Sequence, residues 1–297
     1  MTVLSLFDGM SCGHIALGRA GIQVDKYFAS EIKPHAMKLT LHNYPDTIQL
    51  GDVKKVWYVD GILYSENGQW ETGIDMVIGG SPCQDLSIAN KKRLGLNGNK
   101  SSMFWEYARI LKEVKPKYFL LENVEMPLED KRTVTQELGV NPININSGLV
   151  SAQLRNRWYW TNIEGDQTNL FGWKSVSAPN NKNIKLKDII TDGYVDMEKA
   201  HCLITKFGSA IENLESVWHR YTTVGMTNIV FLSEDRDYKK GLRFFNRKEL
   251  ETLQTVPLGY TDILDINQAL DVLGDGWTVD VIAHFFSYIN EPEWNIS

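Results

Sequence analysis

The stretch of sequence that decides the fold is residues 3–13, which read VLSLFDGMSCG. Its first five residues, Val3 to Phe7, form a short apolar run typical of a buried strand, and a helix is expected at about His14 to Ala20. The turn between them carries Gly9 and Gly13. Glycine lets the backbone come close to a ligand, and the first turn of a helix presents free N–H groups. The sequence therefore predicts a strand–turn–helix unit whose turn can hold a cofactor.

Outward from this unit, the first half of the chain alternates strand-length apolar runs with helix-length amphipathic stretches. Such alternation predicts the α/β class, with a Rossmann-like, mostly parallel sheet that is covered by helices on both faces. The further strands are expected at Lys26–Ser30, Thr47–Leu50, Met76–Gly79 and Tyr118–Leu121, and the further helices at about Pro34–Asn43 and Met103–Val114.

The pattern breaks twice. An insertion at residues 57–73 carries hairpin-turn signals, and residues 162–241 are rich in Asn, Gly, Ser and Lys, with short β-like runs and no long amphipathic helix. Two helices are expected after this region, at 246–255 and 279–289, with a break at Gly274-Asp-Gly. We therefore expect a catalytic and cofactor-binding domain, formed by 1–161 and 243–297, and a small target-recognition domain at 162–242.

The composition excludes several classes of protein. The chain has 297 residues, of which 43% are hydrophobic and 23% charged, the balance of a folded globular protein. No apolar run is long enough to span a membrane, and the first residues lack the basic and apolar blocks of a secretory signal. The three cysteines are widely spaced and predict neither disulfides nor a metal site. We expect a cytoplasmic protein of a bacterium or a phage-infected cell, without a metal.

The net charge of −6 is unevenly distributed along the chain. Residues 249–297 hold nine acidic side chains and no Lys or Arg, so the remainder is net basic. Basic residues concentrate at 91–100 and 236–248. This asymmetry permits a cationic face for nucleic acid on an acidic protein, although a solvated surface explains the charge equally well.

Acidic residues follow the first three expected strands. Asp8, Glu31 and Asp52 should meet at the carboxyl edge of the sheet, where Glu31 can bind ribose hydroxyls. A phosphate-bearing dinucleotide generally needs a cradle without acids, whereas S-adenosylmethionine carries a positive sulfonium. Phe7 can offer its ring face to that cation. Each acid taken alone is more simply explained as a helix cap or a surface charge.

Three further groups follow later strands at the same edge. Cys83 comes just after Met76–Gly79 and before a glycine-containing cationic loop, and Glu122 ends the next strand. An unpartnered carboxylate there is costly, which favours a functional role. Gln153, Arg155 and Arg157 share one face if their segment is a strand. The simpler interpretations are an inert buried cysteine and surface salt bridges.

Taken in order, these segments resemble the DNA cytosine-5 methyltransferases. The matching motifs are Phe7-Asp8-Gly9 to Gly13, Glu31, Asp52, Pro82-Cys83-Gln84, Glu122-Asn123-Val124, Gln153-x-Arg155-x-Arg157, Arg247 to Pro257 and Gly274-Asp-Gly-Trp277-Thr-Val279. The resemblance covers the chain except about 57–73 and 162–242. The wording of the motifs is closest to the eukaryotic de novo branch, but the chain looks like a bare catalytic unit of bacterial or phage style, as in restriction-modification systems.

The resemblance implies methyl transfer from S-adenosylmethionine to carbon 5 of a cytosine flipped out of double-stranded DNA. Cys83 would add to carbon 6, Glu122 would hydrogen-bond N3 and the exocyclic amine, and Arg155 and Arg157 would hold O2 and orient Glu122. The cofactor residues implied are Phe7, Asp8, Gly9, Met10, Ser11, Cys12, Glu31, Ile32, Asp52, Val53, Gly276 and Trp277.

Three other functions stay open at this point. One branch of the same family methylates transfer RNA, and the lobe at 162–242 would decide between the two substrates. A catalytically silent DNA-binding regulator is a second alternative, although such a protein does not need Cys83, Glu122, Arg155 and Arg157 together. A dinucleotide-dependent oxidoreductase fits the fold alone, but Asp8 is unfavourable in its phosphate loop.

Overall fold

The computed structural model describes residues 1–290 except 83–102, 169–171, 204–210, 212 and 226. The chain divides into two compact units. The sheet unit comprises Met1–Ile145, Asn156–Ala178 and Ile282–Ser297, and the second unit comprises Asn146–Arg155 and Pro179–Val281.

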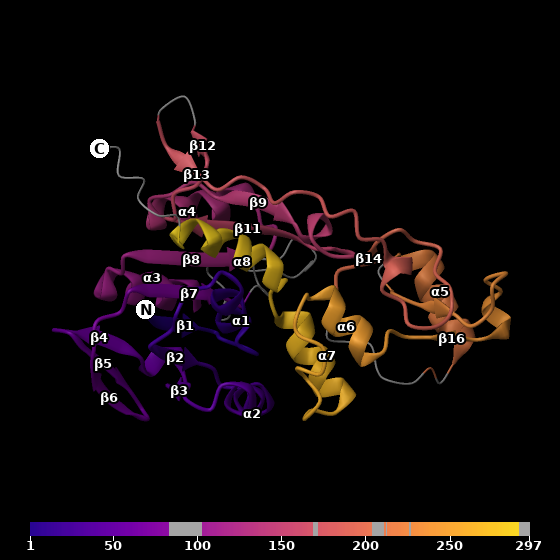
Figure 1. The fold of residues 1–297 in the computed structure, drawn as a ribbon, viewed down its shortest axis with the longest axis horizontal. Helices are drawn as coiled ribbons and strands as arrows, with labels where there is room; N and C mark the ends of the chain where they lie inside the picture. Colours follow the sequence, from indigo (N-terminus) through magenta and orange to yellow (C-terminus); the bar gives the residue numbers. More distant parts are fainter. Residues whose placement is uncertain (83–102, 169–171, 204–210, 212, 226, 291–297) are drawn as a thin grey trace. The chain divides into compact units, whose positions relative to one another are not determined.

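The sheet unit is built on seven strands in the order β3-β2-β1-β7-β8-β11-β9 (Figure 1). Their bounds are β1 Thr2–Leu6, β2 Lys26–Ser30, β3 Ile48–Gln49, β7 Met76–Gly80, β8 Tyr118–Asn123, β9 Ile143–Asn146 and β11 Asn156–Thr161. Strands β3, β2, β1, β7 and β8 pair in parallel, and β11 is antiparallel to β8. The order reverses between β1 and β7, and ligands bind at the carboxyl ends of strands at such switch points. The predicted α/β, mostly parallel sheet is confirmed.

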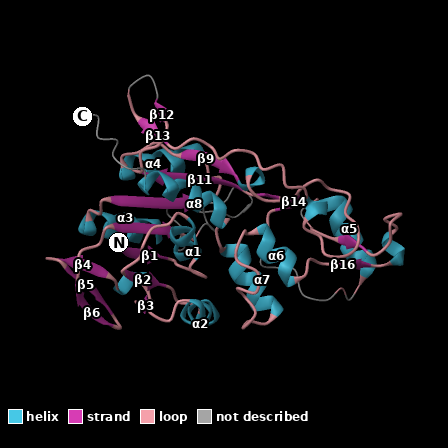
Figure 2. Ribbon diagram, viewed as in Figure 1, coloured by secondary structure: helices cyan, strands magenta, loops and turns pink. Residues whose placement is uncertain are grey.

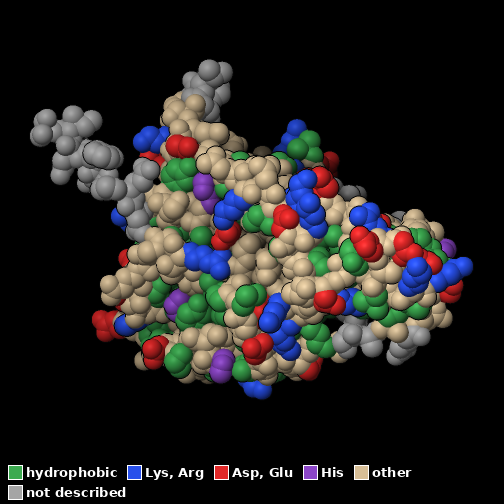
Figure 3. Space-filling view, turned by 45° about the vertical axis from the view of Figure 1, so that its right-hand side comes forward, with side chains coloured by type: hydrophobic (Ala, Val, Ile, Leu, Met, Phe, Trp, Pro, Cys, Tyr) green, Lys and Arg blue, Asp and Glu red, His purple; other side chains and the backbone are tan. Residues whose placement is uncertain are grey.

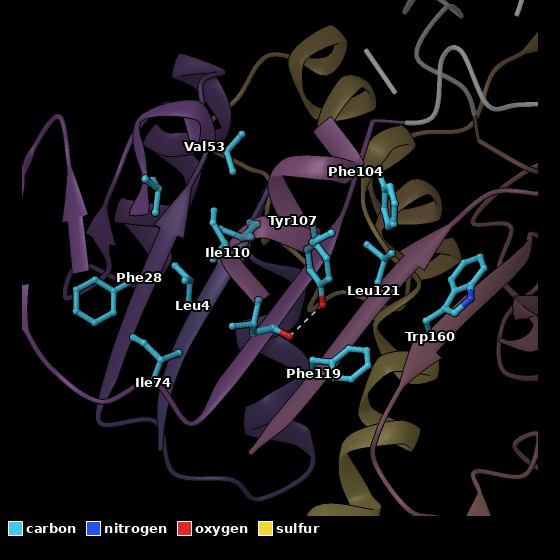
Figure 4. Packing of buried hydrophobic residues seen from close by; sticks show 14 of the residues in the cluster. Leu4, Phe28, Val53, Ile74, Phe104, Tyr107, Ile110, Phe119, Leu121 and Trp160 are labelled. Atoms are coloured by element: carbon cyan, nitrogen blue, oxygen red, sulfur yellow. Dashed lines mark hydrogen bonds between the residues drawn. The ribbon is translucent and has the colours of Figure 1, made fainter. Parts of the chain in front are cut away.

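In the described residues of Met1–Ile145, the sheet unit also contains the helices α1 Cys12–Arg19, α2 Pro34–Asn43, α3 Met103–Val114 and α4 Leu128–Leu138. Helix α3 packs on the sheet through Phe104, Tyr107 and Ile110, which recur every three residues and are fully buried against strand residues that include Leu4 and Leu121 (Figure 4). Burial of each such side chain contributes about 1.5–3 kcal/mol, so this face holds α3 firmly against the strands.

Gly79 lets α3 approach the centre of the sheet. A Cβ at this position would lie 2.9 Å from the carbonyl oxygen of Leu6 and 3.1 Å from the ring of Tyr107. The bare backbone instead leaves room for the Tyr107 ring, whose hydroxyl donates to the carbonyl oxygen of Val77 at 3.4 Å (Figure 4). The glycine therefore fixes the packing at the strand that precedes Pro82.

The predicted hairpin insertion is also confirmed. Strands β4 Trp57–Val59, β5 Ile62–Ser65 and β6 Gly68–Glu71 form an antiparallel sheet of their own (Figure 2). The turn from β4 to β5 carries Asp60 and Gly61 at φ 50° and 81°, the left-handed conformation that Asp and Gly tolerate best among residues.

The second unit contains helices α5 Leu214–Val224, α6 Arg247–Leu253 and α7 Ile266–Asp275, with short strands β10 Gln153–Leu154, β14 Ala200–His201, β15 Val230–Phe231 and β16 Leu242–Arg243. Helix α8 Val279–Ser287 continues the chain into the sheet unit, where β12 Gln167–Thr168 pairs with β13 Lys174–Ser175.

Two expectations about the later chain are wrong. The region 162–241 does contain an amphipathic helix, α5, because Val217 packs with Phe231 and Leu242 of the following short strands. Helix α7 runs through Gly274 and Asp275, and the chain leaves it only at Gly276. Buried Leu270 and Leu273 hold that last turn, which outweighs the low helix propensity of Gly274.

The compact units also divide the chain differently from the functional domains predicted at 1–161, 243–297 and 162–242. Residues 243–281 belong with 179–242 in the second unit. One physical reason is the buried carboxylate of Glu249, which accepts hydrogen bonds from Thr191 N at 2.9 Å and from the Arg243 guanidinium at 2.8 Å. Which residues recognise the target stays a prediction.

His14 ties α1 to its neighbours through stacking. Its ring lies between Tyr27 and Tyr44, with centroid distances of 4.5 and 3.8 Å, and its buried Nδ1 has no hydrogen-bond partner within the described chain. Burial lowers the pKa of His14 to about 4. The ring is therefore neutral at pH 7.

This stack predicts a pH dependence of stability. Because the pKa of His14 is about 6.5 when the chain is unfolded and about 4 when it is folded, the unfolded state takes up the proton first. Stability that is present above pH 6.5 should be lost as the pH falls from 6.5 towards 4. We expect His14→Phe to flatten this part of the profile, measured by urea unfolding at pH 7, 6 and 5, while the exposed control His42→Phe keeps it. An unchanged profile in His14→Phe would contradict the assignment.

Candidate active site

The turn from β1 to α1 has an unusual backbone. Phe7, Gly9 and Ser11 all have positive φ, at 58°, 59° and 59°. Such values are uncommon outside glycine and often mark functional turns. The amide of Asp8 donates to the carbonyl oxygen of Ser30 at 3.0 Å, which joins the ends of β1 and β2. The sequence-predicted cofactor turn therefore lies at the carboxyl edge of the sheet, at its switch point.

Asp8 is held from several sides. Its carboxylate accepts hydrogen bonds from Tyr27 Oη at 2.8 Å and from Ser11 Oγ, which also contacts Thr40 Oγ1 at 2.9 Å. Burial raises the pKa of Asp8 in spite of these donors, and the nearby Glu31 raises it further. A cation at this turn would lower the cost of ionising Asp8.

Glu31 bridges two turns. Oε2 accepts the amide of Gly9 at 2.8 Å, and Oε1 accepts the amides of Ile32 and Lys33 at 2.7 and 2.8 Å. The carboxylate thus fixes the glycine turn after β1 against the segment after β2. It retains lone pairs for hydroxyl donors such as those of a ribose.

Asp52 follows β3 at the same edge of the sheet, next to β2. Its Oδ1 accepts the amide of Lys54 at 3.0 Å and caps the short 3-10 helix η1, Val53–Lys55. The structure therefore brings Asp8 and Glu31 together through Gly9 and leaves Asp52 one strand further along the edge.

The predicted cofactor residues differ in exposure. The side chains of Met10, Cys12 and Val53 are buried in the protein, so only their backbone is suited to contact a ligand. The side chain of Ile32 is 69% exposed.

The ends of β7 and β8 form the second part of the site. Gly80 and Glu122 are register partners, and Asn123 Nδ2 donates to Ser81 Oγ at 2.9 Å. Pro82 is the last described residue of this segment, and the predicted nucleophile Cys83 and the cationic loop lie outside the described residues. The chain therefore reaches the predicted nucleophile directly from the end of the central strand β7.

Glu122 and Arg157 form an ion pair. Glu122 is only 8% exposed, and Arg157 Nε lies 2.8 Å from its Oε1, in a geometry that matches an ion pair better than a linear hydrogen bond. Arg157 comes from β11, which is antiparallel to β8, so neighbouring strands supply the two charges. Arg157 is therefore paired with Glu122, and the catalytic roles of the two residues stay a prediction.

The segment that carries Gln153, Arg155 and Arg157 is not one continuous strand, and whether the three side chains share one site stays a prediction. The segment divides into β10 and β11 with Arg155 between them, and the amide of Arg155 donates to the side-chain oxygen of Asn146 at 3.3 Å. Arg155 belongs to the second unit, where its guanidinium donates to the carbonyl oxygen of Gly276 at 2.8 Å and contacts Cys202 Sγ at 3.1 Å.

The remaining predicted cofactor residues, Gly276 and Trp277, also belong to the second unit. Gly276 ends α7 and accepts the hydrogen bond from Arg155, and Trp277 is buried. The motif that includes Gly276 is therefore fixed to the motif that includes Arg155.

Sequence reasoning missed Lys199. Its ammonium donates to the carbonyl oxygens of Gly148, Ser151 and Ile184 at 2.7, 2.7 and 2.6 Å, and burial lowers its pKa. It thereby fixes the loop that leads to Gln153 and Arg155. No local pattern distinguishes this lysine from the surface lysines around it. Tyr27 was missed too, although a tyrosine in a buried strand generally has a polar partner.

Two arginines of the basic segment 236–248 make contacts that stabilise the fold. Arg243 pairs with the buried Glu249 and with Asp192, and Arg247 donates to the carbonyl oxygens of Thr261 and Leu264. These contacts occupy two of the basic groups that were expected to meet phosphates.

The described part of the chain holds neither a candidate metal site nor a membrane-spanning helix. It contains no group of three or more His, Cys, Asp or Glu side chains placed to hold a metal. Its helices are also all too short or too polar to cross a membrane.

Comparison with known proteins gives both sequence and fold relatives. The type II methyltransferase M.NgoBV of Neisseria gonorrhoeae is 37% identical over 145 residues, which are 46% of this chain and 31% of that protein. The chain thus spans about a third of this relative's length. The methyltransferase EhMeth of Entamoeba histolytica has a similar structure, with a TM-score of 0.66 and 17% identity over 97% of each chain. A DNMT2 variant of Spodoptera frugiperda has a TM-score of 0.61 and 18% identity over 98% of this chain and 99% of that one.

The structural relatives show the fold of this chain. A family model that matches its N-terminal part shows which family that part resembles in sequence. Residues 1–141 match the family described as C-5 cytosine-specific DNA methylase, and this segment includes the Asp8 turn, Glu31, Asp52, Cys83 and Glu122. The N-terminal 141 residues of this chain therefore belong to the C-5 cytosine-specific DNA methylase family.

Proposed function

We propose that this chain transfers a methyl group from S-adenosylmethionine to carbon 5 of cytosine in double-stranded DNA. The observation that carries the proposal is the buried Glu122–Arg157 pair at the end of β8, beside the Ser81–Pro82 segment that leads to Cys83. The family of residues 1–141 is consistent with it.

The residues at the first three strand ends fit the cofactor. S-adenosylmethionine supplies an electrophilic methyl group on a positive sulfonium, and the turn places Asp8 next to Glu31; burial and then the nearby Glu31 raise the pKa of Asp8. Glu31 would accept the ribose hydroxyls, and the Asp52 segment would complete the site. Phe7 would offer its ring to the cation. Gly276 and Trp277 would add the cofactor contacts that the resemblance implies.

The target base would react at Cys83. The thiolate of Cys83 forms a bond to carbon 6, and the electron pair displaced in the ring makes carbon 5 nucleophilic. Carbon 5 would then take the methyl group that bound S-adenosylmethionine supplies, and the cofactor would be left as a neutral thioether. Loss of the proton from carbon 5 to a base restores the double bond and expels the Cys83 thiolate.

Glu122, held protonated or sharing a proton with the base, would hydrogen-bond N3 and accept a hydrogen bond from the exocyclic amine, which favours cytosine over thymine. Arg157 keeps the buried Glu122 carboxylate paired and fixes its direction. Arg155 would contact O2, held in place by its bond to Gly276. Because the base is inaccessible within a duplex, it has to flip out at a cost of a few kcal/mol.

Double-stranded DNA is favoured over transfer RNA by the description of the matching family and by the name of the bacterial relative, a type II methyltransferase. The charge on the face of the molecule shown in Figure 3 does not distinguish the two substrates. On the face shown in Figure 3, basic and acidic side chains are interspersed among neutral ones.

The substrate is tested with tritiated S-adenosylmethionine. We expect label to be incorporated into duplex DNA and not into transfer RNA at equal enzyme and nucleotide concentrations. Bisulfite sequencing of a plasmid from expressing cells should then reveal the methylated cytosines. Label in transfer RNA alone would support the RNA alternative, and DNA binding without any label would support the silent regulator.

The nucleophile is tested with Cys83→Ser. A serine hydroxyl is far less acidic than a thiol and does not add to carbon 6, so methylation should fall below detection. Binding of S-adenosylmethionine, measured by equilibrium dialysis, should stay within about twofold of wild type, because that site lies on other strands. Duplex DNA containing 5-fluorocytosine should trap the wild-type protein covalently and leave Cys83→Ser free. Turnover at the wild-type rate in the serine variant would exclude this chemistry.

The role of the buried ion pair is tested with Glu122→Gln. The amide is neutral, so it removes the charge partner of Arg157 and the carboxyl group that shares a proton with the base. We expect kcat/KM for DNA to fall by about 100-fold or more, with S-adenosylmethionine binding unchanged. The control is Glu129→Gln, an exposed change on α4, which should retain wild-type kinetics. Equal activity of both variants would rule out a catalytic role for Glu122.

A further inference from the structure

The hairpin insertion contacts the segment that precedes and includes Asp52. Both lie in the sheet unit, and the turn between β5 and β6 carries the contacting residues Glu66 and Asn67. Asn67 Nδ2 donates to the carbonyl oxygen of Gln49 at 2.9 Å, and Glu66 Oε1 accepts the amide of Asp52 at 3.2 Å. The insertion therefore binds the backbone of β3 and of the residue that follows Gly51.

Gly51 permits the approach of Glu66. Its φ is +80°, and a Cβ built on it would lie 2.3 Å from Glu66 Oε1. Without a side chain at position 51, the carboxylate lies directly over the backbone. Glu66 Oε2 also pairs with Lys55 Nζ at 2.5 Å at the end of η1. One carboxylate thus connects the beginning and the end of the Asp52 turn.

The same turn is held by the sheet on its other side. Leu50 N donates to the carbonyl oxygen of Ala29, and Ser30 Oγ donates to the carbonyl oxygen of Gly51, both at 2.8 Å. These bonds fix Leu50 and Gly51 but leave the amide of Asp52 to Glu66. The position of Asp52 therefore depends on the insertion as well as on β2.

We propose that Glu66 is a positioning residue for S-adenosylmethionine binding, acting through the backbone amide of Asp52. The proposal rests on the function proposed above, in which the Asp52 segment is part of the cofactor site. A glycine next to Asp52 makes this turn flexible in the absence of an external contact. By holding the turn in its binding conformation before the ligand arrives, Glu66 reduces the ordering cost of binding.

Three variants of the full chain test this role. Glu66→Ala removes both contacts of the carboxylate. Glu66→Gln retains a carbonyl oxygen for the Asp52 amide and loses the charge that pairs with Lys55. The matched control is Glu71→Ala, an exposed glutamate on β6 of the same hairpin. Each variant is measured for its dissociation constant for tritiated S-adenosylmethionine, for kcat and KM, and for thermal unfolding.

We expect Glu66→Ala to raise both the dissociation constant and the KM for S-adenosylmethionine roughly fivefold, as for one lost hydrogen bond. Its kcat at saturating cofactor and its Tm should match those of the control. Glu66→Gln should stay within about twofold of wild type, because an exposed ion pair contributes little.

Each other result would overturn the proposal. If Glu66→Ala binds as tightly as wild type, the contact has no role in the site. If Glu66→Gln binds S-adenosylmethionine as weakly as Glu66→Ala does, the charge of Glu66 and not its hydrogen bond to the Asp52 amide supports cofactor binding. A Tm far below that of the control would make the role structural. Failure of the wild-type chain itself to bind S-adenosylmethionine would instead refute the proposed function, which separates the two failures.

Discussion

The candidate site depends first on the three backbone hydrogen bonds of the Glu31 carboxylate. These bonds join the amide of Gly9, after β1, to the amides of Ile32 and Lys33, after β2. Hydrogen bonds to a charged acceptor contribute about 1.5–3 kcal/mol each, more than neutral ones. They hold a turn in which Phe7 and Ser11 adopt left-handed conformations that cost energy. Glu31 thus stabilises the turn and also presents its charge to any ligand there.

Charge is arranged in opposite ways at the two ends of this sheet edge. Near β1 and β2, the carboxyl groups of Asp8 and Glu31 are close together, and burial of the Asp8 carboxyl group raises its pKa. This arrangement is unfavourable in the free protein and becomes favourable when a cation binds. Near β8 and β11, Glu122 is neutralised by Arg157. The first region is therefore suited to a positively charged ligand, and the second to a polar, uncharged group such as a base.

Much of the sheet unit could be predicted from local sequence. Strands β1, β2, β7 and β8 are short, largely apolar runs with a glycine or an acidic residue at the strand end or within two residues of it, so their type and their common edge followed from the sequence. The hairpin insertion was predictable because Asp60-Gly61 and Asn67-Gly68 are strong turn formers.

What the sequence analysis predicted wrongly or missed depends on contacts between residues that are far apart in the sequence. Arg155 follows a strand-like pattern, yet its amide donates to the side chain of Asn146, a contact that no periodicity reveals. Helix α5 depends on packing against Phe231 and Leu242, which lie later in the chain. Lys199 donates to three carbonyls that distant segments bring together, and nothing in its neighbouring residues indicates them.

In helix α7, tertiary packing extends a helix through residues at which local propensity predicts a break. Gly274-Asp-Gly is a reasonable break by propensity, but propensity differences of about 1 kcal/mol per residue are smaller than the burial of Leu270 and Leu273. The break therefore moves to Gly276, where the helix ends and the carbonyl oxygen is available to Arg155. The residue at which the helix ends is thus the residue that connects two motifs far apart in sequence. Local propensity placed the break at 274–276, and packing decided at which residue of this stretch the helix ends.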